Sequence, residues 1–181
     1  ITEYVAGAGV LATLTSTTAP STVYTLTTSN QGEYVFDGDG RLTRWSDARG
    51  YGFDYTYDAG RLITVTESLS DRYLHWEYNE AGQIIRVSDH AGRHVDFAYD
   101  VSTGDLITVT DVLGQDWTYI YSGTTHLLTD IKDPRGVTMA HIEYDDLGRA
   151  WRQTDAYAQM VVEIAYNLDG TAVLTDARGF T

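Results

Sequence analysis

Two histidines, His75 in "HWEY" and His141 in "HIEY", each stand two residues before a glutamate, Glu77 and Glu143. In a strand this spacing places both side chains on one face, where they could bind a metal ion or transfer a proton. Alignment of the repeats described below argues against both chemistries. The histidine position is occupied in other repeats by residues that share no single chemistry: Asp54, Asp96, Thr118 and Glu163.

The remaining candidate sites are also incomplete. His90 and His94 flank a turn glycine in "HAGRH", but zinc or nickel normally needs three or four ligands, and no third is apparent nearby. The Asp-rich turns raise the possibility of calcium, yet they match neither the EF-hand spacing nor the glycine-rich nonapeptide of calcium-binding β-rolls. No Gly-x-Ser-x-Gly elbow is present. The sequence predicts no catalytic residue, no metal site and no cofactor.

Charge and composition restrict the class of protein and its partners. Asp and Glu outnumber Lys and Arg by 26 to 12, giving a formal net charge of −14. Such a surface repels nucleic acid and anionic membranes, and no apolar run approaches the roughly 18 residues of a membrane helix. There is no cysteine, so disulfides and thiolate chemistry are absent. The 43% hydrophobic and 12% aromatic content, with only two prolines, predicts a folded all-β chain.

An aromatic residue recurs every 21 to 23 residues. Each such interval has room for two strands and two turns. The residues two and four positions before each aromatic are mostly apolar, and the residue three before is polar, which is the period of an antiparallel strand with two different faces. The repeated aromatics are Phe36, Tyr57, Tyr78, Tyr99, Tyr121, Tyr144 and Tyr166.

Two turns punctuate each repeat. The first contains a glycine where a left-handed backbone is expected: Gly40, Gly60, Gly82, Gly104, Gly148 and Gly170. It is preceded by a side chain suited to accept hydrogen bonds from turn amides: Asp37, Asp58, Asn79, Asp100, Asp145 and Asn167. The second turn is Asp-x-x-Gly, from Asp47, Asp89, Asp111, Asp133 and Asp176, with departures at Glu67 and Asp155. The pattern predicts a continuous meander of hairpins.

The polar face of this meander is expected to carry cross-strand pairs. These are Arg44 with Asp54, Arg86 with Asp96, Asp130 with His141, and Arg152 with Glu163. Each should contribute roughly 0 to 1 kcal/mol and mainly fix the register. On the other face, the residue two before the repeated aromatic forms a ladder through Tyr55, Trp76, Phe97 and Tyr119. A packed core or a shell lining explains this ladder better than a sugar-stacking surface.

The tandem units resemble the RHS or YD-repeat family, because "YDAGRL" and "YDDLGR" combine with Asp-x-x-Gly at this period. The resemblance implies a β-sheet ribbon that spirals into a hollow shell, as in bacterial polymorphic toxins, the cocoon of insecticidal toxin complexes, and teneurins. In the bacterial proteins the shell encloses a C-terminal toxin, usually released by aspartyl self-cleavage. That cleavage region is not recognisable in this sequence. "DPRG" at Asp133 occupies an ordinary second turn and is interpreted as such.

These observations predict a lead-in segment at residues 1–22 and an array of about seven RHS/YD units at 23–181, the last one incomplete. The array is expected to be part of a twisted, curved sheet in a β-shell or solenoid. We expect a fragment of a longer protein, or a chain whose sheet edge is covered by further repeats or by another copy.

The predicted function is a non-catalytic scaffold: a shell segment of a large exported or surface protein, of bacterial origin, that encloses or displays a C-terminal effector. The alternatives are an extracellular adhesin that binds a surface glycan or receptor, and a self-associating β-fibre. Nucleic acid and membrane insertion are not expected.

Overall fold

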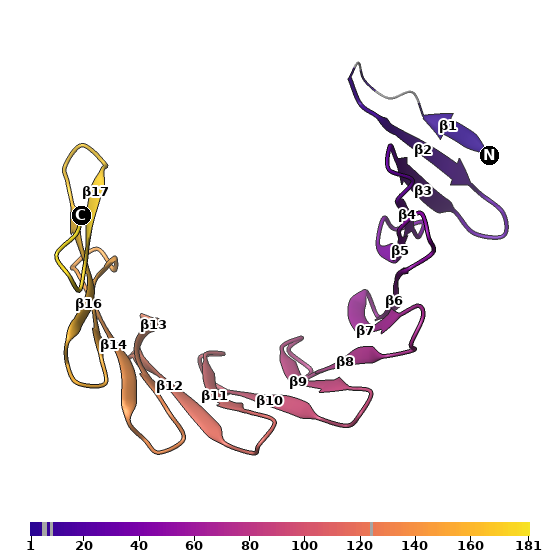
Figure 1. Ribbon diagram of the computed structural model, residues 1–181. Coiled ribbons are helices and arrows are strands. Elements are labelled where there is room, and N and C mark those ends of the chain that lie inside the picture. The colour runs from indigo at the N-terminus through magenta and orange to yellow at the C-terminus, as the bar shows by residue number, and fades with distance from the viewer. Residues whose placement is uncertain (5–6, 8, 124) are drawn as a thin grey trace. The chain divides into compact units, whose positions relative to one another are not determined.

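The computed structural model describes residues 1–4, 7, 9–123 and 125–181. Within them the chain is all-β, as predicted, with seventeen strands and no helix. It divides into two compact units, Ile1–His94 and Val95–Thr181, which are described separately (Figure 1). No helix in these described ranges is long and apolar enough to cross a membrane.

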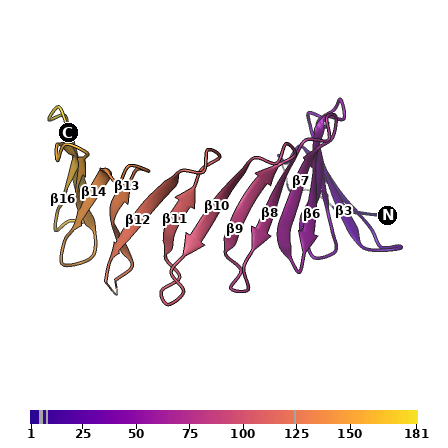
Figure 2. The ribbon, with the colours of Figure 1, turned by 90° about the horizontal axis from the view of Figure 1, so that it is seen from below.

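The first unit is an antiparallel meander in which each strand pairs with the next along the chain. Figure 2 shows β6 to β9 of this unit, with turns alternating between the two margins of the sheet. Its strands are β1 (Thr2–Tyr4), β2 (Ala12–Thr17), β3 (Val23–Thr28), β4 (Glu33–Phe36), β5 (Leu42–Ser46), β6 (Gly52–Asp58), β7 (Arg61–Glu67), β8 (Tyr73–Tyr78) and β9 (Ile84–Asp89).

The second unit repeats the same antiparallel pairing from β10 to β17. Its strands are β10 (His94–Tyr99, whose first residue closes the first unit), β11 (Leu106–Thr110), β12 (Asp116–Ser122), β13 (Leu127–Lys132), β14 (Thr138–Tyr144), β15 (Ala150–Asp155), β16 (Met160–Tyr166) and β17 (Ala172–Asp176). The predicted meander of hairpins is therefore confirmed within each unit.

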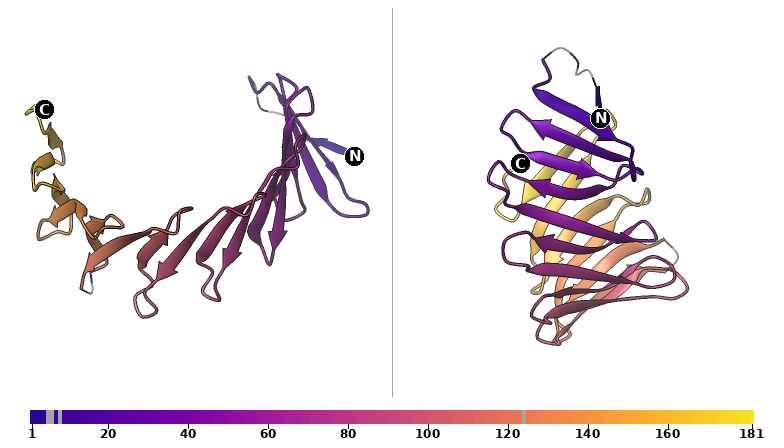
Figure 3. Two further views of the ribbon diagram at one scale, coloured as in Figure 1. Left: turned by 60° about the horizontal axis from the view of Figure 1, so that its bottom comes forward. Right: turned by 90° about the vertical axis from the view of Figure 1, so that its right-hand side faces the viewer.

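The lead-in segment contains strands of the same meander. β2 pairs with β3 from Ala12 opposite Thr28 to Thr17 opposite Val23, and β1 pairs with β2 (Figure 3). Val5, Ala6 and Ala8 of the lead-in, and Thr124 in the turn after Tyr121, lie outside the described residues. The boundary at Val23 between lead-in and array stays a prediction.

The apolar side chains are shared between neighbouring strands, without a second layer to cover them. Tyr34, Trp45 and Phe53 stand opposite one another on β4, β5 and β6, with ring centroids 6.4 and 6.0 Å apart. No hydrophobic side chain in the described parts of the chain is fully buried. The ladder residues Tyr55, Trp76, Phe97 and Tyr119 are only partly buried. Of the packed core and the shell lining expected for them, a packed core therefore does not apply, because a single-layer sheet leaves both faces partly open to water.

The repeated aromatics mark irregularities in strand pairing. The register shifts between the aromatic and the residue before it on β4, β6, β8, β10, β12 and β14. Such a shift is a β-bulge, which bends a strand and increases its twist. The aromatic thus coincides with a bend at the end of each of these six strands, just before the first turn, whereas β16 pairs with β17 through Tyr166 without a shift.

Candidate functional site

Four of the repeated tyrosines connect their repeat to the preceding one through the hydroxyl group. Tyr57, Tyr78, Tyr144 and Tyr166 donate a hydrogen bond to the backbone carbonyls of Leu42, Leu62, Leu128 and Ala150, over 2.8, 2.7, 2.8 and 2.7 Å. Each accepting residue lies two positions before the first residue of its strand that pairs with the tyrosine's strand. The hydroxyl therefore takes the place of a backbone amide where the ladder ends.

Partial burial accompanies this arrangement. It raises the pKa of Tyr57, Tyr99 and Tyr121 above that of a free phenol. A raised pKa keeps the phenol protonated over the physiological range, so the hydroxyl proton needed for the hydrogen bond of Tyr57 is retained. Phe36, the first repeated aromatic, has no hydroxyl to donate.

The Asp-x-x-Gly turns share one hydrogen-bond pattern. In the turn from Asp47, the carboxylate accepts the amides of Arg49 and Tyr51 at 2.8 and 3.0 Å, and the Gly50 amide donates to the Asp47 carbonyl. The same two carboxylate bonds recur at Asp37, Asp89, Asp111, Asp133, Asp145, Asp155 and Asp176. The six first-turn glycines predicted from the sequence have φ between 73° and 86°.

Asp133, considered above as a protease residue, belongs to this group of turn aspartates. Its side chain is only 6% exposed and accepts the amides of Arg135 and Val137, while the Arg135 guanidinium donates to it at 2.6 Å. Burial raises the pKa of Asp133, but the hydrogen bonds from Arg135 and Val137 outweigh it and hold the pKa below its usual range. Both oxygens of the Asp133 carboxylate thus accept hydrogen bonds from residues of its own turn.

The turn from Asp58 is different. Ala59 and Gly60 both have positive φ, of 46° and 82°, and Asp58 pairs directly with Arg61. This two-residue hairpin is one residue shorter than the equivalent turns after Phe36, Tyr78, Tyr144 and Tyr166, and two shorter than the turn after Tyr99. The expectation that Asp58 accepts turn amides is wrong for the described residues, because the shorter turn has no amide in the required place. At Asn167 the expectation also fails: Asp169 accepts the Thr171 amide instead.

The histidines occupy separate positions. His75 contacts the Thr64 hydroxyl at 3.1 Å, whereas His141 is 2.9 Å from Asp130. His90 lies against the Tyr73 ring, and Nδ1 of His94 is 3.3 Å from the Gly92 carbonyl. In the ranges that the structure describes, no three His, Asp or Glu side chains come together as a metal site would require.

The cross-strand pairs follow the predicted register. Arg44 stands opposite Asp54 with 3.6 Å between their charged groups. Asp130 stands opposite His141. Arg152 stands opposite Glu163 as predicted, but its ion pair is with Glu143 on the other neighbouring strand, at 3.5 Å. The fourth pair, Arg86 with Asp96, would join residues of the two separately described units and stays a prediction.

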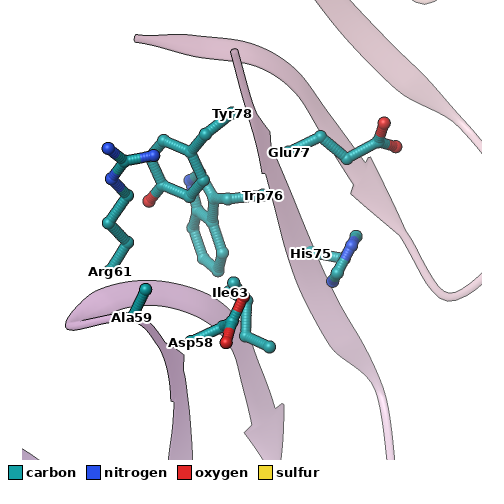
Figure 4. A pocket seen from close by; sticks show the side chains of 8 residues that line it. All are labelled: Asp58, Ala59, Arg61, Ile63, His75, Trp76, Glu77 and Tyr78. Atoms are coloured by element: carbon teal, nitrogen blue, oxygen red, sulfur yellow. The ribbon is translucent and has the colours of Figure 1, made fainter. Parts of the chain in front are cut away.

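A groove of about 480 Å³ lies beside the short turn in the first unit. It is lined by Asp58, Ala59, Arg61, Ile63, His75, Trp76, Glu77 and Tyr78 (Figure 4). Trp76 and Tyr78 project from one side of β8 toward Arg61, while His75 and Glu77 project from the other. The Arg61 guanidinium lies 5.7 Å from the centre of the Tyr78 ring. We call this site the Trp76 groove.

Sequence reasoning placed Trp76 in the aromatic ladder but did not identify Asp58 or Arg61 as part of a groove. The sequence signal that could have revealed the groove is the spacing between the repeated aromatic and the strand that follows it. Leu62 stands five positions after Tyr57, whereas Leu42, Ile84 and Ala150 each stand six positions after Phe36, Tyr78 and Tyr144. A turn shorter by one residue cannot reproduce the hydrogen bonds of its longer equivalents.

Comparison with known proteins identifies the repeat. Residues 36–71 match the family model described as RHS Repeat. The chain is 28% identical over 161 residues to the Double-stranded DNA deaminase toxin A of Burkholderia cenocepacia (strain H111), covering 81% of this chain and 11% of the toxin. It is 32% identical over 111 residues to the Probable deoxyribonuclease RhsB of Dickeya dadantii (strain 3937), covering 49% of this chain and 8% of that protein.

Solved structures show the same fold. The crystal structure of TcdB2-TccC3-TEV matches with a TM-score of 0.58 at 19% identity, over 91% of this chain and 11% of the other. The crystal structure of TcdB2-TccC3 without hypervariable C-terminal region matches with a TM-score of 0.57 at 18% identity, with the same coverage. The chain therefore spans about a tenth of the length of each of these proteins. The chain thus carries an RHS repeat at residues 36–71, set among tandem tyrosines, Asp-x-x-Gly turns and an antiparallel meander of the same kind.

Proposed function

We propose that the chain is a non-catalytic segment of the wall of a protein shell that encloses a C-terminal effector. The main support is the way successive repeats depend on one another. Each repeat is too thin to have a buried apolar core, and each tyrosine hydroxyl among the four named above bonds to the strand of the preceding repeat. Such a unit gains stability from its neighbours and can be extended strand by strand, as a wall requires.

The comparisons support the same proposal at the level of the whole protein. The relatives are large, and two of them carry names of toxins or nucleases that act on DNA. A sheet with a net charge of −14 is poorly suited to bind DNA directly. We therefore assign any effector activity to a part of the parent protein other than these repeats. The parent is expected to be a bacterial exported or surface protein.

The experiment uses the full-length parent protein. It is treated with a nonspecific protease before and after acid or urea opens the repeats, and the fragments are identified by mass spectrometry. A shell predicts that the segment following the repeats is protected in the native protein and becomes sensitive after opening. Equal cleavage of that segment in both states would refute enclosure, as would a parent in which no further segment follows the repeats.

A further inference from the structure

The Trp76 groove combines two features that set its repeat apart. The turn from Asp58 to Arg61 is the short hairpin described above. The ladder position facing it carries the indole of Trp76, whereas the equivalent positions carry Tyr34, Tyr55, Phe97, Tyr119, Ile142 and Ile164. In a repeat protein the ordinary positions serve the fold. Two departures that meet in one groove therefore need an explanation beyond the fold.

The short turn leaves an acid and a base without the partners they have elsewhere. In the longer turns, Arg41 pairs with Asp37 and Asp39, and Arg149 pairs with Asp145 at 2.7 Å. In the described residues Asp58 has neither a hydrogen bond nor an ion pair through its carboxylate, and the Arg61 guanidinium lies over the Tyr78 ring and beside Gly82. The one-residue-shorter turn thus keeps apart an acid and a base of the kind that the turns from Asp37 and Asp145 hold together.

The groups left available suit a sugar ring. The half-buried indole of Trp76 presents a flat apolar surface, and its N–H has no hydrogen-bond partner among the described residues. A pyranose has an apolar C–H face that stacks on such a ring and hydroxyls that both donate and accept hydrogen bonds. The Asp58 carboxylate can accept from these hydroxyls, while the Arg61 guanidinium and the indole N–H can donate to them.

Charge and size narrow the ligand class. On the side of β8 that carries Trp76, the charged groups are the Asp58 carboxylate and the Arg61 guanidinium, whereas His75 and Glu77 line the groove from the other side. The surface around the indole therefore favours neither an anion nor a cation, since Asp58 repels the first and Arg61 the second. The volume of about 480 Å³ is within the range of small-ligand sites. We propose that the Trp76 groove binds a neutral hexopyranose unit of an oligosaccharide, with Trp76 stacking on the ring and Asp58 and Arg61 hydrogen-bonding its hydroxyls.

The direct test follows the indole N–H signals of the purified chain by NMR. The protein has four tryptophans, and a Trp76→Phe variant assigns the relevant signal. Cellohexaose, maltohexaose and chitohexaose are each titrated to about 10 mM, the range of weak sugar binding. A saturable shift of the Trp76 signal with one of them is expected. No shift with any of the three, or equal shifts of all four signals, would overturn the proposal.

Variants test which groups carry the binding. Asp58→Asn and Trp76→Leu should each weaken the affinity at least about tenfold, as expected for central contacts of a small site. Inserting one residue between Asp58 and Ala59 should restore the longer turn, re-form the acid–base pair and abolish binding without loss of the sheet, as seen by circular dichroism. Phe97→Leu, at the same ladder position in the next repeat, is the matched control and should bind normally.

If Phe97→Leu weakens binding as much as Trp76→Leu, the sugar is recognised by the ladder in general and the assignment to this groove is wrong. The result is also separable from the shell proposal. Asp58→Asn in the parent should leave the protease protection of the C-terminal segment unchanged, so failure of sugar binding and failure of enclosure are distinct outcomes.

Discussion

The turns from Asp58 and from Asp145 occupy the same place in two repeats but differ by one residue. In the longer turn, Asp145 accepts the amides of Leu147 and Arg149 and pairs with the Arg149 side chain. In the shorter turn, Asp58 and Arg61 stand opposite each other as neighbouring strand residues and form no such pair within the described residues. The length of a turn therefore decides whether its charged side chains stabilise the turn or remain available to a ligand.

The largest expected effect concerns the strand that leads to the short turn. Gly52 begins β6, where Thr138 begins β14 in the compared repeat. A Cβ at Gly52 would lie 1.9 Å from the Trp45 carbonyl oxygen and 2.7 Å from the Ser46 Cα, both backbone atoms that cannot easily move. We expect Gly52→Ala to reduce the free energy of unfolding by about 3 kcal/mol, as in severe overpacking.

Urea denaturation followed by circular dichroism measures this loss. Thr138→Ala is the control and should change the free energy of unfolding by no more than about 0.5 kcal/mol, since it only shortens a partly exposed side chain. An unfolding free energy for Gly52→Ala close to that of the parent chain would show that β5 and β6 approach less closely than the structure indicates.

The tyrosine hydroxyls should have equal effects in the two repeats, despite their different turns. Tyr57 and Tyr144 both donate to the preceding strand at 2.8 Å. Tyr57→Phe and Tyr144→Phe should each lower the free energy of unfolding by about 1 kcal/mol, because a partly buried carbonyl loses its donor. Thermal or urea unfolding of both variants provides the measurement. A loss confined to Tyr144→Phe would mean that the short turn alters the hydroxyl bond as well.

The sequence predicted the features that depend on neighbouring residues, such as strand register, better than the features that depend on distant parts of the structure, such as burial. Period-two alternation placed Arg44 opposite Asp54 correctly, because strand pairing across a short turn is a local geometric consequence. It did not predict that Trp45 and Phe53 would lack a covering layer, since burial depends on what lies against the sheet. The groove was not predicted because the residue types of the ladder do not reveal it. It depends on the shorter turn at Asp58, which only the spacing between repeats indicates.

A single substitution in the turn from Asp155 is expected to stabilise the chain slightly. This turn makes the same carboxylate bonds as the turn from Asp145, but the residue with positive φ is Ala158, at 57°, where the other turn has Gly148 at 73°. A side chain in this conformation is strained, whereas glycine is not. Ala158→Gly should raise the free energy of unfolding by about 0.5 kcal/mol, after allowing for the greater freedom of glycine in the unfolded chain.

Urea denaturation at constant pH can measure this increase if the variant and the parent are unfolded in parallel. Gly148→Ala is the reciprocal control and should destabilise by a similar or larger amount. If both substitutions lower the stability, strain at the positive-φ position is not what distinguishes the two turns.

The smallest expected effect concerns the acid sensitivity that the aspartates of the longer turns give to the fold. Hydrogen bonds from the Arg149 side chain and amide lower the pKa of Asp145, and a hydrogen bond from the Ser102 hydroxyl, with those of turn amides, lowers the pKa of Asp100 to about 2. A carboxyl group whose pKa is lower in the folded than in the unfolded chain stabilises the fold above its unfolded pKa. That stability is lost as the pH falls through the folded pKa.

For Asp100 this window runs from the ordinary value of 3.8 down to about 2. Asp100→Asn and Asp145→Asn should therefore flatten the decline of unfolding free energy below pH 4, because each removes a carboxylate whose pKa the turn hydrogen bonds lower. Urea midpoints measured at half-unit steps of pH would reveal the difference. An undiminished decline in both variants would show that these hydrogen-bonded carboxylates do not set the acid sensitivity of the fold. The longer turns would then be stabilised by their backbone geometry and not by the charge of their aspartates.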